Sequence, residues 1–433
     1  MSSEAAGLVG FFAMLLLIGL RVPVAIAMGT VGLAGGWYLN GWASVTFILG
    51  SAPFETVFPY GLSVIPLFVM MGVFAAHAGM SQSLYRAIHA LIGHYRGGLA
   101  NATIGACAAF GAICGSSLAT AATMCRVALP EMRRNGYADS LAAATIAAGG
   151  TLGILIPPSV VMVVYALLTE QSIGKMFAAG LLPGLLATLL YMGAVLVQLR
   201  LRPGLAPPSP RPERAARLVA YREVWPVALL FVLVMGGIYV GWFSPTEAAA
   251  IGAFGTFVHA AARRRLSLRV LGTCLGETAT TTAMIFAILI GTAIFNYFVE
   301  TTGLPRLLIA EAEALGWNRY AVLLLVILFY LALGCFMDSL SMVFITVPFV
   351  FPLVTAMGFD PIWFGVLLVC VVEIGLITPP VGMNLFVIVG ISGDLRLQTA
   401  IRGILPFILA DALRILILVA FPAISLFLPS LMD

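Results

Sequence analysis

The stretch from Cys114 to Ser159 decides the fold of this chain. It opens with CGSSLATAA, passes through LPEMRRNGY and ends with GILIPPS, so polar and helix-breaking residues interrupt an otherwise apolar sequence. A second copy lies 222 positions later, at 336–381, where FMDSLSMVF, FPLVTAMGF and GLITPPV follow in the same register. The pairs that are identical without a gap are Ser117/Ser339, Leu118/Leu340, Pro130/Pro352, Gly136/Gly358, Gly153/Gly375, Pro157/Pro379 and Pro158/Pro380.

Five of these seven identities are Pro or Gly. Pro removes a backbone donor and Gly costs backbone entropy, and both weaken a helix where unpaired backbone groups are costly, as in a bilayer. A single Pro-Pro pair can merely kink a membrane helix. Two pairs in register predict broken helices, and paired interruptions in two halves of one chain indicate the binding site of a transporter.

The composition predicts an all-α protein that crosses the membrane many times. Hydrophobic residues make up 61% of the chain and charged residues 9%, against about half and a quarter in soluble domains. Basic residues exceed acidic ones by four and lie mainly in loops, which argues against a nucleic-acid partner. The six cysteines lie in apolar sequence without a CxxC motif, so we expect buried thiols rather than disulfides or a metal site.

A basic linker divides the chain into two halves, 1–205 and 225–433. The linker, 206–224, is rich in Pro and Arg and lacks apolar periodicity, and the positive-inside rule places it in the cytoplasm. Following the other basic loops in both directions predicts five crossings in each half, with the N- and C-termini in the periplasm. We expect Leu8–Leu20 to be kept as the first helix, because no basic segment of a cleaved signal peptide precedes it.

The segment at about 97–130 is expected to enter the membrane and return on the same side. Only 29 residues separate Arg96 from Arg126. Two arms of about 14 residues would each span roughly 21 Å, which is less than the hydrocarbon core of about 30 Å. A single full crossing is the alternative, and it would place Arg126, Arg133 and Arg134 outside. The repeat predicts a second hairpin at about 320–357.

An odd number of crossings in each half predicts that the two halves lie upside down relative to each other, as an inverted repeat. Each half then has five crossings and one re-entrant helical hairpin. One crossing in each half is a broken helix, at about 138–168 in the first half and about 362–390 in the second. The segment 41–58 is too polar for a comfortable span and is expected along the outer interface.

The hairpin tips and the broken helices are predicted to form two sodium sites. Backbone carbonyls freed at membrane depth, together with Ser and Thr hydroxyls, supply the hard oxygens that Na⁺ binds. The residues expected at the first site are Ser116, Ser117, Gly153, Ile156 and Pro157. The residues expected at the second site are Asp338, Ser339, Ser341, Gly375, Thr378 and Pro379.

A small organic anion is the expected substrate. Helix N-termini carry partial positive charge, so an anion between the two tips would be stabilised. The residues expected to contact it are Ser117, Ser159, Ser339 and Asn384.

Several charged residues inside apolar segments need partners. An acid at mid-bilayer costs about 2.5–3.5 kcal/mol on insertion scales, so Asp338 and Glu373 either bind an ion or proton or pair with a nearby hydroxyl or Arg. Asp411 lies three positions before Arg414, and this spacing favours a structural ion pair between them. For Arg126, a role in anchoring the chain at the cytoplasmic face is favoured over a contact with a carboxylate.

At these motifs the chain resembles the large membrane subunit of TRAP transporters, the tripartite ATP-independent periplasmic carriers. The resemblance runs from RVPVAIAMG through PEMRRNGY and GILIPPS to FMDS and GLITPPVGMNLFV, and it covers essentially the whole chain. It implies an elevator-type transporter fold with two inverted hairpins in the bacterial inner membrane. It also implies sodium coupling, a separate small four-helix membrane subunit, and a periplasmic substrate-binding protein that delivers a carboxylate such as a C4-dicarboxylate or sialic acid.

The sequence therefore predicts sodium-coupled secondary active import of a small organic carboxylate handed over by a periplasmic binding protein. An alternative is a stand-alone sodium- or proton-coupled anion symporter that needs no binding protein. The motifs GxxxxGK[ST], HExxH and GxSxG are absent, so the sequence gives no sign of ATP hydrolysis or of an intramembrane enzyme. Two occluded half-sites also suit alternating access better than a channel.

Overall fold

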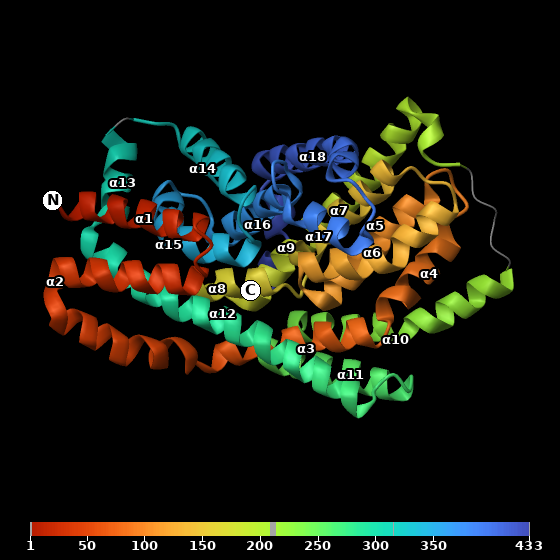
Figure 1. Ribbon diagram of the computed structural model, residues 1–433, viewed down its shortest axis with the longest axis horizontal. Helices are drawn as coiled ribbons and strands as arrows, with labels where there is room; N and C mark the ends of the chain where they lie inside the picture. Colours follow the sequence, from red (N-terminus) through yellow and green to blue (C-terminus); the bar gives the residue numbers. More distant parts are fainter. Residues whose placement is uncertain (1, 208–213, 315, 433) are drawn as a thin grey trace.

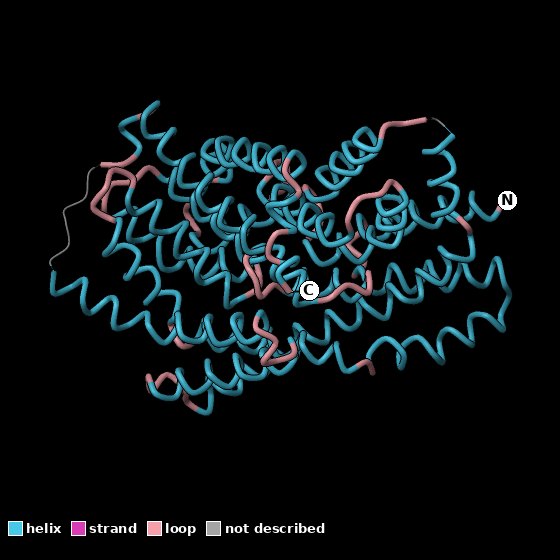
Figure 2. Tube along the Cα trace, turned by 180° about the vertical axis from the view of Figure 1, so that it is seen from behind, coloured by secondary structure: helices cyan, strands magenta, loops and turns pink. Residues whose placement is uncertain are grey.

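The computed structural model describes residues 2–207, 214–314 and 316–432. Within these ranges the chain is α-helical with short 3-10 turns, and no strand is assigned (Figure 1 and Figure 2). The α-helices are α1 (Ser3–Gly19), α2 (Val24–Val57), α3 (Val64–His77), α4 (Met80–Ile92), α5 (Gly98–Cys114), α6 (Ser117–Arg134), α7 (Asp139–Leu155), α8 (Val160–Leu168), α9 (Ile173–Leu201), α10 (Arg214–Tyr239), α11 (Pro245–Ala262), α12 (Leu268–Thr302), α13 (Leu304–Ala314), α14 (Arg319–Gly334), α15 (Ser339–Ala356), α16 (Pro361–Ile377), α17 (Met383–Ser392), α18 (Leu397–Ala420) and α19 (Ala423–Leu426). Residues 208–213 of the predicted linker lie outside the described residues.

In the C-terminal part of α18, large apolar side chains face outward and a charged cluster faces inward, the reverse of a soluble amphipathic helix. On α18, Leu405, Leu409 and Leu416 are 60%, 61% and 67% exposed, whereas Asp411 and Arg414 are fully buried. In water the charged face of an amphipathic helix would lie outside. The prediction of an all-α polytopic membrane protein is therefore confirmed.

By length and hydropathy, six helices of the described chain could cross a membrane. They are Tyr60–His77, Ile173–Leu201, Ala220–Tyr239, Leu268–Thr302, Ser339–Ala356 and Leu397–Ala420. The pair α7 and α8 passes the same test as one span that is bent by 41° at its break. Other expected crossings fall on helices that are shorter than 18 residues, such as α1 and α16 with 17 residues each. The total of ten crossings therefore stays a prediction.

Helix boundaries in the two halves follow the 222-residue offset of the predicted repeat. The first hairpin is α5 and α6 and the second is α14 and α15, and α15 begins and ends 222 positions after α6. The same offset relates α16 to α7. The arms of the first hairpin have 17 and 18 residues, rather than about 14, because the turn lies at Gly115 and Ser116, after the midpoint between Arg96 and Arg126, and α6 continues past Arg126 to Arg134. Such arms span about 26 Å, so length alone does not fix re-entrance, and the hairpins' re-entry and the inversion stay predictions.

Three segments differ from what their composition suggests. The short helices α4 and α13 lie where loops were expected, because they are too short and too charged to give a hydrophobic span. Arg86 of α4 pairs with Glu223 of α10 at 2.9 Å. The polar segment after Gly41 continues α2 as far as Val57, and Gly41 itself has a φ of +76°, which bends the helix there.

Two long helices form one layer of the molecule. Figure 1 shows α2 and α12 side by side along one edge, with α3 and α11 beside each other in the same layer. The hairpins, the broken helices and α18 make up the other part. Glycines let α2 and α12 approach closely: a β-carbon at Gly32 would lie 2.8 Å from Ile294 O, and one at Gly291 would lie 2.5 Å from Ala25 O.

A buried ion cluster joins helices of both halves. Arg414 Nη1 lies 2.7 Å from Glu373 Oε2, and Arg414 Nη2 lies 2.9 Å from Asp411 Oδ1. Tyr191 of α9 donates to Asp411 Oδ2 at 2.8 Å, and its hydroxyl lies 3.2 Å from Thr151 Oγ1 of α7. The structure thus confirms the Asp411–Arg414 pair and gives Glu373 an arginine partner. These contacts connect α7 and α9 to α16 and α18.

Replacing Gly32 by Ala is expected to destabilise the protein by about 1–3 kcal/mol, because the new methyl group overpacks the α2–α12 contact. Gly29 is the matched control, since it lies one turn earlier in α2 and has no atom within 4 Å of its β-carbon position. The measurement is the melting temperature of the two Ala variants in detergent. Equal melting temperatures would contradict the close packing at Gly32.

Replacing Arg414 by Met is expected to cost about 3–5 kcal/mol, because two buried carboxylates lose their counter-charge. Arg402→Met, an exposed cation on the same helix, is the control and is expected to change little. Adding Glu373→Gln and Asp411→Asn to the Arg414→Met chain is expected to recover part of the loss. Thermal unfolding of all variants tests this, and a wild-type melting temperature for Arg414→Met would show that the cluster does not stabilise the fold.

Candidate functional site

The first hairpin turns between Cys114 and Ser117. Gly115 has a φ of +65°, a conformation that glycine adopts without strain. Ser116 is extended, and its hydroxyl accepts a hydrogen bond from Ala119 N at 3.4 Å, so it caps the N-terminus of α6. The Gly-Ser pair therefore ends one helix and starts the next within two residues.

The break between α7 and α8 lies against this tip. Ser159 caps α8 by accepting from Met162 N at 3.3 Å, and its hydroxyl donates to Ile154 O at 2.6 Å. Val160 N donates to Gly115 O at 3.4 Å. Tip and break thus satisfy polar groups that each leaves unpaired.

Hard oxygens gather where α6 meets the end of α7. A β-carbon at Gly153 would lie 2.7 Å from Thr120 Oγ1 and 2.8 Å from Ser116 O. Thr120 is fully buried, and its hydroxyl has no hydrogen-bond partner among the described residues. Of the residues predicted for the first sodium site, Ser116 and Gly153 are therefore in contact range, and Ile156 and Pro157 follow in the break. Thr120 was not predicted, although it lies one helical turn after Ser116.

At the second tip, the predicted ion ligands are engaged in capping. Asp338 accepts hydrogen bonds from Leu340 N and Ser341 N, each at 3.1 Å, and also from the Ser341 hydroxyl. The Thr378 hydroxyl donates to Ile374 O at 2.6 Å. The groups at this tip that are left for an ion are the carboxylate's remaining lone pairs and the backbone carbonyls of the break.

Glycine also allows the second tip and the second break to meet. A β-carbon at Gly375 would lie 2.6 Å from Gly334 Cα. The thiol of Cys335, the residue after α14, donates to Pro379 O at 3.6 Å. The end of α14 therefore lies against the second broken helix at Gly375 and Pro379.

Two predicted substrate residues from different halves contact each other. Asn384 Nδ2 donates to Ser117 Oγ at 2.8 Å and to Ala147 O at 3.0 Å. Ser117 and Asn384 are both buried. This amide therefore holds α17 of the second half against α6 and α7 of the first half.

A partly polar cavity of about 330 Å³ lies between the two tips and the long-helix layer. Ser116 and Ser339 line it at the tips, and helices α3, α6, α8 and α12 supply most of the remaining wall. Of the four predicted substrate residues, Ser339 lines the cavity, whereas Ser117, Ser159 and Asn384 do not. The charged or titratable residues on its wall are Arg126 of α6, Glu277 of α12 and His77 of α3.

The contacts of α6 continue beyond the cavity. Arg133 lies 2.7 Å from Asp139 Oδ1 and 3.1 Å from Asp394 Oδ1. The hydrogen bonding that Arg133 donates to the Asp139 carboxylate is the main cause that raises the pKa of Arg133 above its ordinary value. The end of the hairpin is thus fixed to the start of α7 and to the loop before α18.

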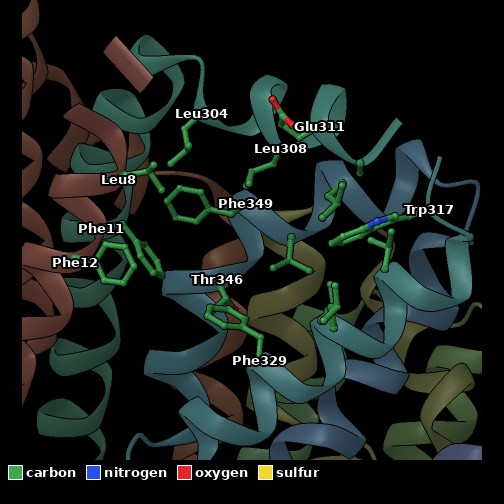
Figure 3. Close-up of a pocket in the computed structure, with 16 residues that line it drawn as sticks. Leu8, Phe11, Phe12, Leu304, Leu308, Glu311, Trp317, Phe329, Thr346 and Phe349 are labelled. Atoms are coloured by element: carbon green, nitrogen blue, oxygen red, sulfur yellow. The ribbon is translucent and has the colours of Figure 1, made fainter. Parts of the chain in front are cut away.

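A larger cavity, of about 450 Å³, lies between α1, α13, α14 and α15. Its wall is formed by apolar side chains such as Phe11, Phe329 and Phe349 (Figure 3). Thr346 also lines it, but its hydroxyl is hydrogen-bonded to Tyr330. With so few polar groups this cavity is poorly suited to an anion, and the cavity between the tips is the better candidate for the functional site.

The sequence matches the family model described as tripartite ATP-independent periplasmic transporter, DctM component, over residues 9–424. It is 39% identical over 378 residues to the C4-dicarboxylate TRAP transporter large permease protein DctM of Pseudomonas aeruginosa, covering 87% of this chain and 88% of that protein. It is 33% identical to the sialic acid TRAP transporter large permease protein SiaM of Vibrio cholerae, covering 86% of this chain and 87% of that protein. It is 34% identical to the isethionate TRAP transporter permease protein DctMQ of Oleidesulfovibrio alaskensis, covering 97% of this chain and 65% of that protein.

Two solved transporters share the fold. The YdaH transporter of Alcanivorax borkumensis superposes with a TM-score of 0.62 at 16% identity, covering 96% of this chain and 98% of that chain. MtrF of Neisseria gonorrhoeae superposes with a TM-score of 0.53 at 11% identity, covering 97% of this chain and 95% of that chain. The family match, the relatives and the broken-helix fold agree, and the chain therefore belongs to the DctM family of TRAP transporter large permeases and is a secondary transporter rather than an enzyme.

Proposed function

We propose that this chain imports a small organic carboxylate across the bacterial inner membrane, driven by Na⁺ and supplied by a periplasmic binding protein. The observation that carries the proposal is the partly polar cavity that Ser116 and Ser339 of the two tips both line. Free N–H groups at a helix N-terminus favour an anion. Because Asp338 already accepts from two amides of α15, the N-terminus of α6 supplies most of this positive field.

The names of the relatives support an anionic substrate. Among them are proteins named for C4-dicarboxylates, sialic acid and isethionate, and one is named for ectoine. The relative named DctMQ extends well beyond the part that this chain matches. That extra length supports a small membrane subunit as a partner of this chain.

The first Na⁺ is proposed to bind between α6 and the end of α7. Ser116 O and the unpaired Thr120 hydroxyl supply two oxygens beside Gly153, and carbonyls between Gly153 and Pro157 complete the shell. The C-terminal end of α7 adds a partial negative charge that favours a cation. A second ion is proposed at Asp338 and Ser339 with the carbonyls from Gly375 to Pro379.

The transport step is proposed to be an elevator motion. The hairpins and broken helices of two inverted halves would carry the substrate past the layer that contains α2 and α12. Asn384 and the Arg414 cluster support this division, because they bind the two halves into one body.

Uptake into proteoliposomes tests the proposed function. The chain, its small subunit and its binding protein are reconstituted and supplied with labelled succinate, N-acetylneuraminate or isethionate. Succinate or N-acetylneuraminate is expected to accumulate when an inward Na⁺ gradient is imposed, and accumulation is expected to require the binding protein. Accumulation of isethionate alone would contradict a carboxylate as the substrate. Equal uptake with K⁺ in place of Na⁺ would contradict sodium coupling, and full uptake without the binding protein would favour the stand-alone symporter.

Replacing Thr120 by Val is expected to raise the Na⁺ concentration for half-maximal uptake about tenfold, which corresponds to about 1.4 kcal/mol. The substitution keeps the side chain's shape and removes one ion ligand. Thr46→Val is the control, because this exposed hydroxyl bonds only to carbonyls of its own helix. If uptake by Thr120→Val depends on Na⁺ as in the wild type, the ion does not bind at this position.

The proposed topology predicts which introduced cysteines a membrane-impermeant thiol reagent can reach. All six native cysteines are buried, so their background labelling should be low. Leu431→Cys, near the C-terminus, is expected to react in intact spheroplasts. Arg264→Cys, in a predicted cytoplasmic loop, is expected to react only after lysis, and the opposite pattern would reverse the orientation.

A further inference from the structure

One face of α6 lines the cavity from the tip to a single arginine. Ser116, Ala119, Thr123 and Arg126 all lie on the cavity wall, and their spacing of three or four residues is that of one helix face. Arg126 is the cationic residue of this face. It lies about 15 Å along the helix from the tip, at 1.5 Å per residue.

Arg126 differs from the other arginines of its helix because it lacks a partner. Arg133 is held by Asp139 and Asp394, and Arg134 lies 3.2 Å from Glu131. Arg126 makes no ion pair or hydrogen bond to any residue that the structure describes, and its side chain is exposed. Because Arg126 lines the cavity and has no counter-charge among the described residues, its guanidinium is available to an anionic ligand.

The wall between the tip and Arg126 is made of small side chains. Ala119 and Ala122 line it, and they leave room for a ligand along the helix. Helical side chains lean toward the N-terminus of their helix, and for Arg126 this is the direction of the tip. The cavity is therefore a slot with the partial positive charge of the α6 N-terminus at one end and a full positive charge at the other.

The opposite wall carries the negative charge of the cavity. Glu277 of α12 lines it, and Glu277 Oε1 lies 3.8 Å from His77 Nε2 of α3. These two residues belong to the long-helix layer, whereas Arg126 belongs to the hairpin. An anionic ligand is thus drawn to the α6 side of the cavity and repelled from the α12 side.

We infer that Arg126 binds the anionic group of the substrate at the mouth of this cavity and so determines its specificity for organic anions. The inference deepens the proposed function and rests on it. A guanidinium can bind a carboxylate or sulfonate through two parallel hydrogen bonds, which a lysine cannot reproduce. The substrate class is therefore a carboxylate or sulfonate whose anionic group lies beside α6.

The test compares uptake kinetics of Arg126→Gln, Arg126→Lys and Arg134→Gln in the reconstituted full transporter. The probes are succinate, N-acetylneuraminate and isethionate under an inward Na⁺ gradient. For each anion that the wild type accepts, Arg126→Gln is expected to raise KM at least tenfold, and Arg126→Lys is expected to raise it less. Arg134→Gln, whose side chain lies on the same helix but away from the cavity, is expected to keep the wild-type KM.

A wild-type KM for Arg126→Gln, or a lower maximal rate at unchanged KM, would overturn the inference and leave the proposed function standing. Failure of the wild type to take up any of the three anions would instead contradict the proposed function. If Arg126→Gln shows no uptake, the deciding measurement is the increase in melting temperature of the purified Arg126→Gln chain when the anion that the wild type accepts is added. Loss of that stabilisation supports binding by Arg126, and wild-type stabilisation overturns it.

Discussion

The site depends on one constraint: backbone groups freed where a helix breaks inside the membrane must find partners within the protein. Gly115 O of the first tip accepts from Val160 N of the first break, and within the break the Ser159 hydroxyl donates to Ile154 O. If the tip and the break were apart, the hydrogen bond between Gly115 and Val160 would be lost. This explains why the CGSS and IPPS motifs occur in the same chain some forty residues apart.

The same constraint draws the two halves into one body. The side-chain amide of Asn384 donates two hydrogen bonds to the first half, one to Ser117 and one to Ala147. Arg414 of α18 holds Glu373 and Asp411, and Asp411 accepts from Tyr191 of the first half. Because these contacts are buried, separating the halves would expose charges and amides to the bilayer. A hairpin that moves must therefore take the opposite half's broken helix with it, which is the mechanical basis of the proposed elevator.

The sequence predicted the elements of the site better than its contacts. Pro and Gly act locally, so the pairs Pro157/Pro158 and Pro379/Pro380 identified the breaks, and the boundaries of α6 and α15 agree with the repeat. The Ser117–Asn384 contact joins residues 267 positions apart, and nothing in either motif specifies it. Glu373 illustrates the same limit: its acid needed a partner, but only the fold shows that the partner is Arg414.

The short helices reveal a different limit of sequence reasoning. A hydrophobic stretch identifies a span, yet α4 and α13 are short, partly charged and held by tertiary contacts. Thr120 could have been found, because it follows Ser116 by one turn on the helix that the motif begins. Only the fold shows that Gly153 lies beside the Thr120 hydroxyl, which has no hydrogen-bond partner among the described residues.

The two tips, although related by the repeat, differ in charge. Ser116 caps α6 with a neutral hydroxyl, so the positive end of that helix remains available to an anion. Asp338 caps α15 with a carboxylate, which offsets the positive end of that helix. The N-terminus of α6 therefore keeps a positive field that the N-terminus of α15 has largely lost. Two tips that share a sequence motif thus differ in charge, as the proposed binding of an anion together with coupling ions requires.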